Sequence, residues 1–420
     1  MRPRLPAPLR ERDYARLVAA LVAMGFGREM VLVAVGWQVY AIDRNPLHLG
    51  LVGLAEFLPL PLLALPAGAI ADRLSRKRVF VASVTLDAAI TVGLLVVSLG
   101  GANELWPFLA LSLASGVAAA LGNPAARAMP PTLVPRELLA SALALRSTVG
   151  QATVVTGPAL GGLLFAISPQ LVYASGVGLF LVAAVAVAAI RPRVVEDAPS
   201  FVAGTRLGAL FAGLRFVRRT PVLFGAISLD LVAVLFGGAV ALLPLFARDV
   251  LEVGPAGLGV LRSGPAVGAL LAGIMLTRRP VGGRAGRTLL LVVAVFGASM
   301  IVFGLSRSFA LSFAALAVGG FADMISMNIR ATIVALATPD ALRGRVNAVE
   351  MVFISASNEL GAFESGAAAA LVGAVPAVVA GGAITIAAAL AWPRLFPTMA
   401  RIDRLESLAP DDGTRSVIAS

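Results

Sequence analysis

The sequence predicts an all-α, polytopic membrane protein with twelve transmembrane helices in two pseudo-symmetric halves of six helices each. Its composition is 59% hydrophobic and 14% charged, with a mean hydropathy of +0.92, which excludes a water-soluble globular domain. Apolar runs of about 20 residues, long enough to cross the bilayer as helices, recur along the whole chain. The halves repeat weakly, since PPTLVPRELLASALAL matches VALATPDALRGRVNAV with Pro135 and Pro339 in register.

The apolar segments define the expected spans in order. In the first half they fall at about residues 17–42, 47–71, 79–100, 104–126, 139–167 and 169–190. In the second half they fall at about 221–247, 255–277, 287–306, 309–333, 346–372 and 375–393. The run after the basic leader continues past Arg28, so we expect a retained first span rather than a cleaved signal peptide.

The chain therefore divides into four parts. We predict an N-terminal half at 1–190, a cytoplasmic linker at 191–220, a C-terminal half at 221–393 and a cytoplasmic tail at 394–420. The second part of the linker places apolar residues at helical spacing, flanked by arginines. This pattern fits a helix on the inner membrane surface and a solvated linker helix equally well.

The basic turn GAIADRLSRKRVF, residues 68–80, sets the orientation. Its cations mark the cytoplasmic side, because basic loops are retained there. Nearly all of the 34 basic residues fall on the same side, and only Arg44, Arg248 and Arg307 fall on the other. Both termini are thus expected in the cytoplasm. The net charge of +11 reflects topology in the lipid bilayer, and we expect no nucleic-acid partner.

The residue types present argue against an enzyme. The chain has no cysteine and a single histidine, His48, so it offers no thiolate or histidine metal cluster. No nucleotide-binding loop or nucleophile constellation is present either. We therefore predict no catalytic residues, no metal site and no cofactor.

The same turn resembles the loop signature of the major facilitator superfamily, G-x-x-x-D-R-x-x-R-[RK]. The matching residues are Gly68, Asp72, Arg73, Arg76 and Lys77, whereas the second glycine of the signature is Ser75 here. A generic basic loop would account for the cations but not for the spacing of the glycine and the aspartate. The resemblance implies the major facilitator fold and a turn that latches an inner gate.

The fifth span carries a second pattern, VGQATVVTGPALGGLL. Gly157, Gly161 and Gly162 permit close helix packing, and Pro158 removes one helix hydrogen bond. These four residues resemble the G-P-x-x-G-G signature of major facilitator exporters. Structural packing and antiport are both compatible with such a helix, so the pattern favours export without excluding a packing role.

Ionisable residues deep within the spans are expected to have structural or functional roles, since a charge at the membrane centre costs about 2.5–3.5 kcal/mol. They are Arg28, Glu29, Glu56, Asp230, Asp323, Glu359 and Glu364. Two roles compete for them: a structural pair such as Arg28 with Glu56, or a carboxylate that lines the pathway of substrate and protons. A desolvated carboxylate is able to hold a proton near neutral pH.

The superfamily resemblance orders these candidates. Its first, fourth, seventh and tenth helices line the central cavity, which implies that Glu29, Asp230 and Asp323 lie nearest the substrate. Asp87 is expected to pair near the Gly68 turn. Arg330 and Glu350 are expected to act at a gate or to reach the membrane surface with their side chains, as residues towards helix ends do. All of these positions are thus predictions about a transport pathway.

Three stretches resemble one branch of the superfamily more closely: WQVYAIDRNPLHLGLVGLAEFLPL, TPDALRGRVNAV and SNELGAFESG. They are similar to bacterial transporters grouped with enterobactin exporters and the third family of drug:proton antiporters. The resemblance implies a monomeric, proton-coupled exporter of a siderophore, drug or amphipathic metabolite in the bacterial inner membrane, working by alternating access. A solute importer, a uniporter and a non-transporting sensor remain alternatives, and only the sensor should tolerate amides at every embedded carboxylate.

Overall fold

The computed structural model describes residues 6–63, 75–191 and 206–408. Within these ranges every regular element is helical, as the sequence predicts. Eleven helices among the described residues are long and apolar enough to cross a membrane. The 33-residue helix α15 (Asp340–Val372) falls outside this set. It carries Glu350, Glu359 and Glu364, which lower its hydropathy although its length suffices to span the bilayer.

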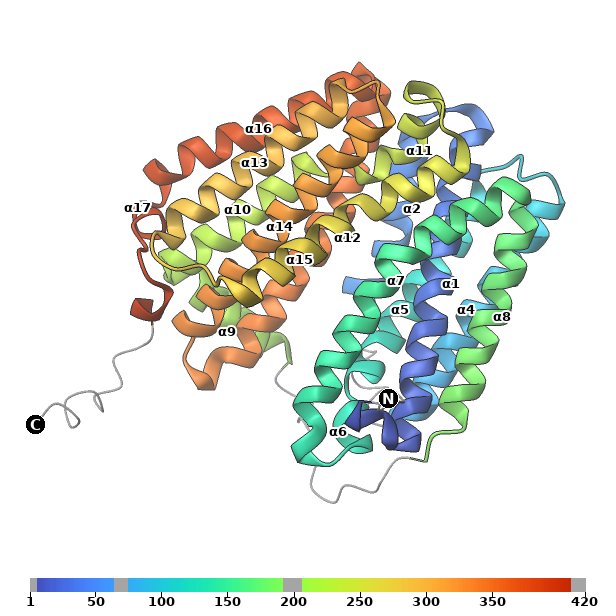
Figure 1. Cartoon of the computed structure of the whole chain (residues 1–420), viewed down its shortest axis with the longest axis horizontal. Coiled ribbons are helices and arrows are strands. Elements are labelled where there is room, and N and C mark those ends of the chain that lie inside the picture. The colour runs from blue at the N-terminus through green and yellow to red at the C-terminus, as the bar shows by residue number, and fades with distance from the viewer. Residues whose placement is uncertain (1–5, 64–74, 192–205, 409–420) are drawn as a thin grey trace, which may run out of the picture. The chain divides into compact units, whose positions relative to one another are not determined.

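The helices up to residue 188 correspond to the first six expected spans (Figure 1). The six spans are α1 (Arg12–Asp43), α2 (Pro46–Phe57), α4 (Arg76–Leu99), α5 (Trp106–Arg127), α7 (Leu139–Ile167) and α8 (Pro169–Ala188), and the four-residue α6 (Pro130–Leu133) lies in the connection between α5 and α7. The second span continues from α2 to Leu63. Helix starts follow local chemistry: Asn45 caps α2 by accepting from the Leu47 N–H, and Pro46 occupies the first turn.

The remaining helices follow residue 205. They are α9 (Arg206–Arg219), α10 (Pro221–Gly237), α11 (Leu243–Leu245), α12 (Gly254–Arg278), α13 (Ala285–Leu305), α14 (Phe309–Ala337), α15, α16 (Ala374–Leu395) and α17 (Pro397–Ala400). A π-helical segment, Phe246–Val250, follows α11 directly. Helical spacing in the linker thus predicted α9, and one face of it packs on α15 where Gly213 lies against the Arg345 carbonyl.

The seventh expected span, 221–247, is not one continuous helix. Helix α10 ends at Gly237, and Gly238 has a non-helical ψ of 60°. Two consecutive glycines weaken the helix at this point, and the Ser365 hydroxyl donates to the Gly238 carbonyl at 3.3 Å. A broken membrane helix exposes backbone groups, a feature that transporters use at ligand sites.

Contacts divide the structure into two units. The first unit comprises Met1–Gly204 and Val240–Ala266, and the second comprises Thr205–Ala239 and Val267–Ser420. The division of the sequence at 190 and 221 remains a prediction. It differs from these units because residues 240–266 pack with the first six spans.

The core of the first unit forms where α1 packs on α7 and α8, and where α4 packs on α5 and α8. Tyr14, Phe80 and Phe180 lie in one apolar cluster there. The Tyr14 hydroxyl is fully buried and donates to the Ala142 carbonyl at 2.5 Å, which satisfies its polar group. This hydrogen bond joins α1 to α7.

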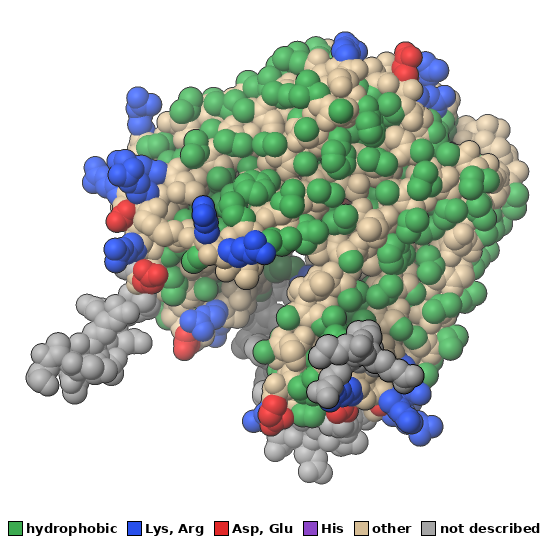
Figure 2. Space-filling model, in the orientation of Figure 1, with side chains coloured by type: hydrophobic (Ala, Val, Ile, Leu, Met, Phe, Trp, Pro, Cys, Tyr) green, Lys and Arg blue, Asp and Glu red, His purple; other side chains and the backbone are tan. Residues whose placement is uncertain are grey.

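The core of the second unit centres on α13, which packs against both α14 and α16, while α10 packs against α15 and α16 (Figure 1). The Trp392 indole donates to the Gly225 carbonyl at 2.9 Å. Large apolar side chains such as Val185 and Leu390 are more than half exposed. Figure 2 shows hydrophobic side chains over the helix flanks and charged side chains near the helix ends, as lipid contact requires.

Candidate functional site

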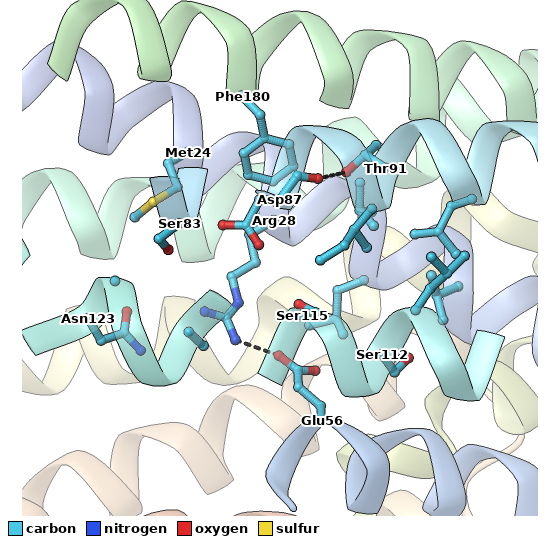
Figure 3. Close-up of a pocket in the computed structure, with 18 of the residues that line it drawn as sticks. Met24, Arg28, Glu56, Ser83, Asp87, Thr91, Ser112, Ser115, Asn123 and Phe180 are labelled. Atoms are coloured by element: carbon cyan, nitrogen blue, oxygen red, sulfur yellow. Dashed lines mark hydrogen bonds and ion pairs between the residues drawn. The ribbon is translucent and has the colours of Figure 1, made fainter. Parts of the chain in front are cut away.

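A cavity of about 80 Å³ lies inside the first unit, between α1, α2, α4, α5 and α8 (Figure 3). We call it the first-unit cavity. Three charged residues line it: Arg28 from α1, Glu56 from α2 and Asp87 from α4. Serines from α4 and α5 and apolar side chains from α1, α4 and α8 complete the lining. The cavity thus gathers charge from three helices at one point within the membrane.

Arg28 and Glu56 form a salt bridge, with 2.5 Å between the Arg28 Nη2 and the Glu56 Oε1 atoms. The pair that the sequence suggested is therefore present in the structure. The Arg28 side chain is 48% exposed and that of Glu56 is 18% exposed. The pair therefore borders the cavity and is only partly enclosed by the protein.

Asp87 lies in the first-unit cavity, and its expected pairing near the Gly68 turn is wrong. It follows the start of α4 at Arg76 by eleven residues, a rise of about 16 Å along the helix axis. Asp87 interacts electrostatically with Arg28 and Glu56 instead. The sequence pattern did show a buried charge in the third span, but its partner comes from other helices.

Glycines on α5 hold the helices around this cavity close together. A side chain at Gly116 would collide with the backbone carbonyl of Glu56, and one at Gly122 would collide with Ser83. The Ser83 hydroxyl also donates to the Ala118 carbonyl at 2.8 Å. The position of the charged residues is therefore set by backbone-to-backbone packing.

Glu29 faces different neighbours from Arg28, because consecutive helical residues point about 100° apart. A side chain at Gly157 of α7 would come within 2.7 Å of the Glu29 Cβ atom. Glu29 also interacts electrostatically with Arg262 of α12. The structure thus brings one predicted pathway carboxylate near an arginine of α12.

The fifth-span pattern lies at the contacts of α7. Gly161 faces the backbone of Met30 on α1, and Gly162 faces the backbone of Gly259 on α12. Both glycines and the neighbouring Pro158 are buried. Their packing role is therefore visible, whereas their link to antiport remains a prediction.

A further polar cluster joins α1 to the π-helical segment. The Tyr40 hydroxyl donates to the Asp249 carboxylate, and Arg44 lies 3.8 Å from the same carboxylate. The Arg248 guanidinium lies over the Trp37 ring, 5.7 Å from its centroid. Sequence reasoning missed this cluster, although Arg44 and Arg248 were two of the few cations assigned to the outer side.

Replacing Asp249 by asparagine should lower the free energy of unfolding by about 1 kcal/mol, because a charge-assisted hydrogen bond becomes a neutral one. Thermal unfolding of the purified protein in detergent measures the change. Glu252→Gln, an exposed carboxylate three residues further along, is the matched control and should leave the unfolding midpoint unchanged. Equal midpoints for all three proteins would show that the Tyr40–Asp249 contact contributes nothing to stability.

The second unit has its own charged cluster. Asp230 of α10 and Arg330 of α14 form a salt bridge of 2.5 Å, and both side chains are less than a tenth exposed. The expectation that the Arg330 side chain reaches the membrane surface is therefore wrong, because its guanidinium is buried in the helix bundle, whereas a role at a gate stays a prediction. The Arg330 Nε atom also donates to the Ser326 hydroxyl at 3.3 Å.

Asp323 lies near this pair. It precedes Arg330 by seven residues, which places both on one face of α14. With Asp230 and Ser326 it lines a space of about 10 Å³, and unlike Asp230 it is exposed. Glu350 of α15 interacts electrostatically with both Arg330 and Asp230. The sequence-predicted residues Asp230 and Asp323 are thus brought together.

The positions of the other predicted residues do not test their predicted roles. Glu359 and Glu364 lie further along α15 at intermediate exposure. Arg76 and Lys77 begin α4, where Arg76 donates to the Ala128 carbonyl at 3.2 Å. Gly68, Asp72 and Arg73 lie outside the described residues, so the inner latch stays a prediction. No group of three histidine, cysteine or acidic side chains among the residues described is arranged to hold a metal ion.

Comparison with known families gives a match over nearly the whole chain. A family model described as transmembrane secretion effector matches residues 5–411. Among curated proteins, the enterobactin exporter EntS of Shigella boydii serotype 18 is 27% identical over 339 residues, which cover 79% of this chain and 78% of the relative. The EntS protein of Escherichia coli O1:K1 is also 27% identical, with the same coverage.

Solved structures with low sequence identity show the same fold. A bacterial homologue of the human lysosomal transporter Spinster matches with a TM-score of 0.73 at 17% identity, covering 94% of this chain and 99% of its own. The nucleoside transporter NupG matches with 0.73 at 14% identity, covering 91% and 100%. A bacterial homologue of the iron transporter ferroportin matches with 0.70 at 17% identity, covering 93% and 99%. The predicted fold class is confirmed.

Proposed function

We propose that this chain, which belongs to the transmembrane secretion effector family of major facilitator transporters, exports a siderophore, drug or amphipathic metabolite in exchange for protons. The protein is a multi-span membrane transporter of small molecules and not an enzyme. The relatives named as enterobactin exporters support the outward direction. The bacterial inner membrane, cytoplasmic termini and a monomeric state complete the proposal.

The observation that carries the proposal is the set of ionisable residues inside the membrane-spanning helices of both units. Glu29 faces Arg262 in the first unit, and Asp230 is salt-bridged to Arg330 in the second. Each such group carries a desolvation cost that a purely structural helix bundle avoids with apolar side chains. Charges retained at this cost favour a role in moving substrate or protons.

In the proposed cycle, the substrate pathway includes Glu29 of the first unit, and it includes Asp230 and Asp323 of the second unit. Protonation of a carboxylate weakens its interaction with the neighbouring arginine and with a cationic substrate group, which favours release. The break after Gly237 supports a change of helix geometry close to Asp230, since an interrupted helix bends there at little cost. The Gly68–Arg78 turn is proposed as the inner latch of this alternating-access cycle.

Proton flux in proteoliposomes tests the proposal. Purified protein is reconstituted with a pH dye inside, a proton gradient is imposed, and lipophilic cations, a catecholate siderophore and neutral amphiphiles are added in turn. At least one compound should accelerate collapse of the gradient, and protein-free liposomes control for leak. If the folded protein shows no proton flux with any of these compounds and transports none of them, proton-coupled export is contradicted.

Glu29→Gln is expected to reduce the substrate-dependent proton flux about tenfold or more, equivalent to at least about 1.4 kcal/mol at the transport step. The amide keeps the shape of the side chain but removes its charge and its proton. Glu104→Gln, an exposed carboxylate in the connection between α4 and α5, is the control and should transport normally. Unchanged flux in Glu29→Gln would remove Glu29 from the pathway.

A further inference from the structure

The first-unit cavity has a charge imbalance. Among the residues that line it, one guanidinium, that of Arg28, faces two carboxylates, those of Glu56 and Asp87; Glu29, which is not a lining residue, also interacts with Arg28 and is itself balanced by Arg262. The other helices in contact contribute only uncharged lining groups, among them Ser115 and Asn123 of α5 and Phe180 of α8 (Figure 3). With both carboxylates ionised, the cavity therefore holds one net negative charge within the membrane.

Arg28 forms a salt bridge with only one of the two carboxylates. Arg28 is 2.5 Å from Glu56, whereas Asp87 interacts with Arg28 through space and forms no ion pair with any described residue. The Thr91 hydroxyl holds the Asp87 backbone carbonyl at 2.7 Å and leaves its carboxylate directed to the cavity (Figure 3). Asp87 is thus the carboxylate that carries the excess charge.

The volume of the cavity limits the size of the species that can enter it and neutralise the negative charge. A volume of about 80 Å³ is well below the roughly 300–1,000 Å³ of pockets that enclose drug-sized ligands. It is sufficient for a few water molecules, each of which needs about 10–15 Å³. The cavity therefore accommodates water, which is able to deliver a proton.

We propose that Asp87 carries the coupling proton, with the Arg28–Glu56 pair as its positioning partner. This assignment rests on the proposed proton-coupled function and names the residue. A hydronium ion in the cavity water transfers its proton to an Asp87 carboxylate oxygen: the O–H bond of the acid forms, an O–H bond of the hydronium breaks, and neutral water remains. The acid later returns the proton to a water molecule by the reverse transfer.

The proton changes the balance of forces on Arg28. When Asp87 is ionised, it attracts the guanidinium away from Glu56; when Asp87 is neutral, this attraction is lost, and Arg28 keeps its salt bridge to Glu56 and a weaker interaction with Glu29. Glu56 is held by the close packing of its backbone against Gly116. Movement of the Arg28 side chain therefore alters the attraction between α1 and α4, which links protonation to helix positions.

Infrared difference spectroscopy tests the assignment without knowledge of the substrate. Films of the full-length protein in lipid are titrated from acidic to mildly alkaline pH, and the carboxylic acid C=O stretch is recorded. The wild-type protein should show a titrating band that is lost in Asp87→Asn and kept in Glu104→Gln. A band that persists unchanged in Asp87→Asn would overturn the assignment.

Two further variants define the outcome. The Glu56→Gln variant should retain the carboxylic acid band. If the band is lost in Glu56→Gln but kept in Asp87→Asn, the proton belongs to Glu56 and the proposal is refuted. Asp87→Glu should retain a titrating band at a shifted position and guards against a misfolded Asp87→Asn protein. In the proteoliposome assay, the proton flux of Asp87→Asn should be about tenfold or more below that of the wild type. If the wild-type protein shows no proton flux, the proposed function is refuted, and the infrared spectrum still shows whether Asp87 binds a proton.

Discussion

Replacing Arg330 by methionine is expected to lower the free energy of unfolding by about 3–5 kcal/mol, because the buried Asp230 carboxylate then lacks its cation. The Asp230–Arg330 pair lies inside the second unit with both side chains almost fully enclosed. Neither charge reaches water when its partner is removed. Thermal unfolding of the detergent-purified protein is the measurement, and Arg307→Met, an exposed arginine, is the control.

A double variant separates stability from function. Asp230→Leu with Arg330→Met replaces the pair by apolar groups and should restore most of the lost stability, since no uncompensated charge remains. If Asp230 also belongs to the substrate pathway, this stable protein should still fail to transport. Recovery of transport together with stability would show that the pair is structural only. A single Arg330→Met protein as stable as the wild type would contradict the burial argument itself.

Replacing Gly162 by alanine should have the second large effect, on transport. The added methyl group would collide with the Pro255 carbonyl and come within 2.9 Å of the Gly259 Cα atom, so α7 and α12 must separate. Overpacking of this kind costs about 1–3 kcal/mol. In a two-state transport cycle, that cost changes the population of the packed state by about 5- to 150-fold.

Gly150→Ala on the same helix is the matched control, because no atom lies within 4 Å of the added methyl group. It should be neutral or slightly stabilising, since alanine favours helix over glycine by about 1 kcal/mol. Substrate-dependent proton flux should therefore fall in Gly162→Ala and stay normal in Gly150→Ala. Normal flux in both variants would show that the close approach of α7 and α12 is not needed for transport.

The sequence predicted the number, order and approximate limits of most spans, because hydrophobic length is a local property of the chain. It also identified charged positions such as Arg28 and Asp230, since a charge in an apolar run is visible without a structure. The break in the seventh span was harder to predict from the sequence. Gly237 and Gly238 indicate weakness, but apolar residues continue on both sides and hydropathy alone shows no interruption.

Pairings between charges were predictable only in part. The Arg28–Glu56 pair was suggested because both charges lie deep in neighbouring spans. Asp87 and Arg330 were assigned to the wrong surroundings, because depth along a helix does not determine which face of that helix meets which neighbour. Side-chain direction follows from helix rotation, and rotation is fixed by contacts such as those of Gly116 and Gly122 on α5.

The sequence by itself thus determined that this protein is a polytopic helical membrane protein of the major facilitator type, with charges inside its spans. Bilayer thickness and the cost of buried charge act on local segments and can be read residue by residue. Only the tertiary structure decided that Asp87 shares a cavity with the Arg28–Glu56 pair, and that Arg330 is buried against Asp230. Those partners lie on different helices, and the packing of the whole unit brings them together.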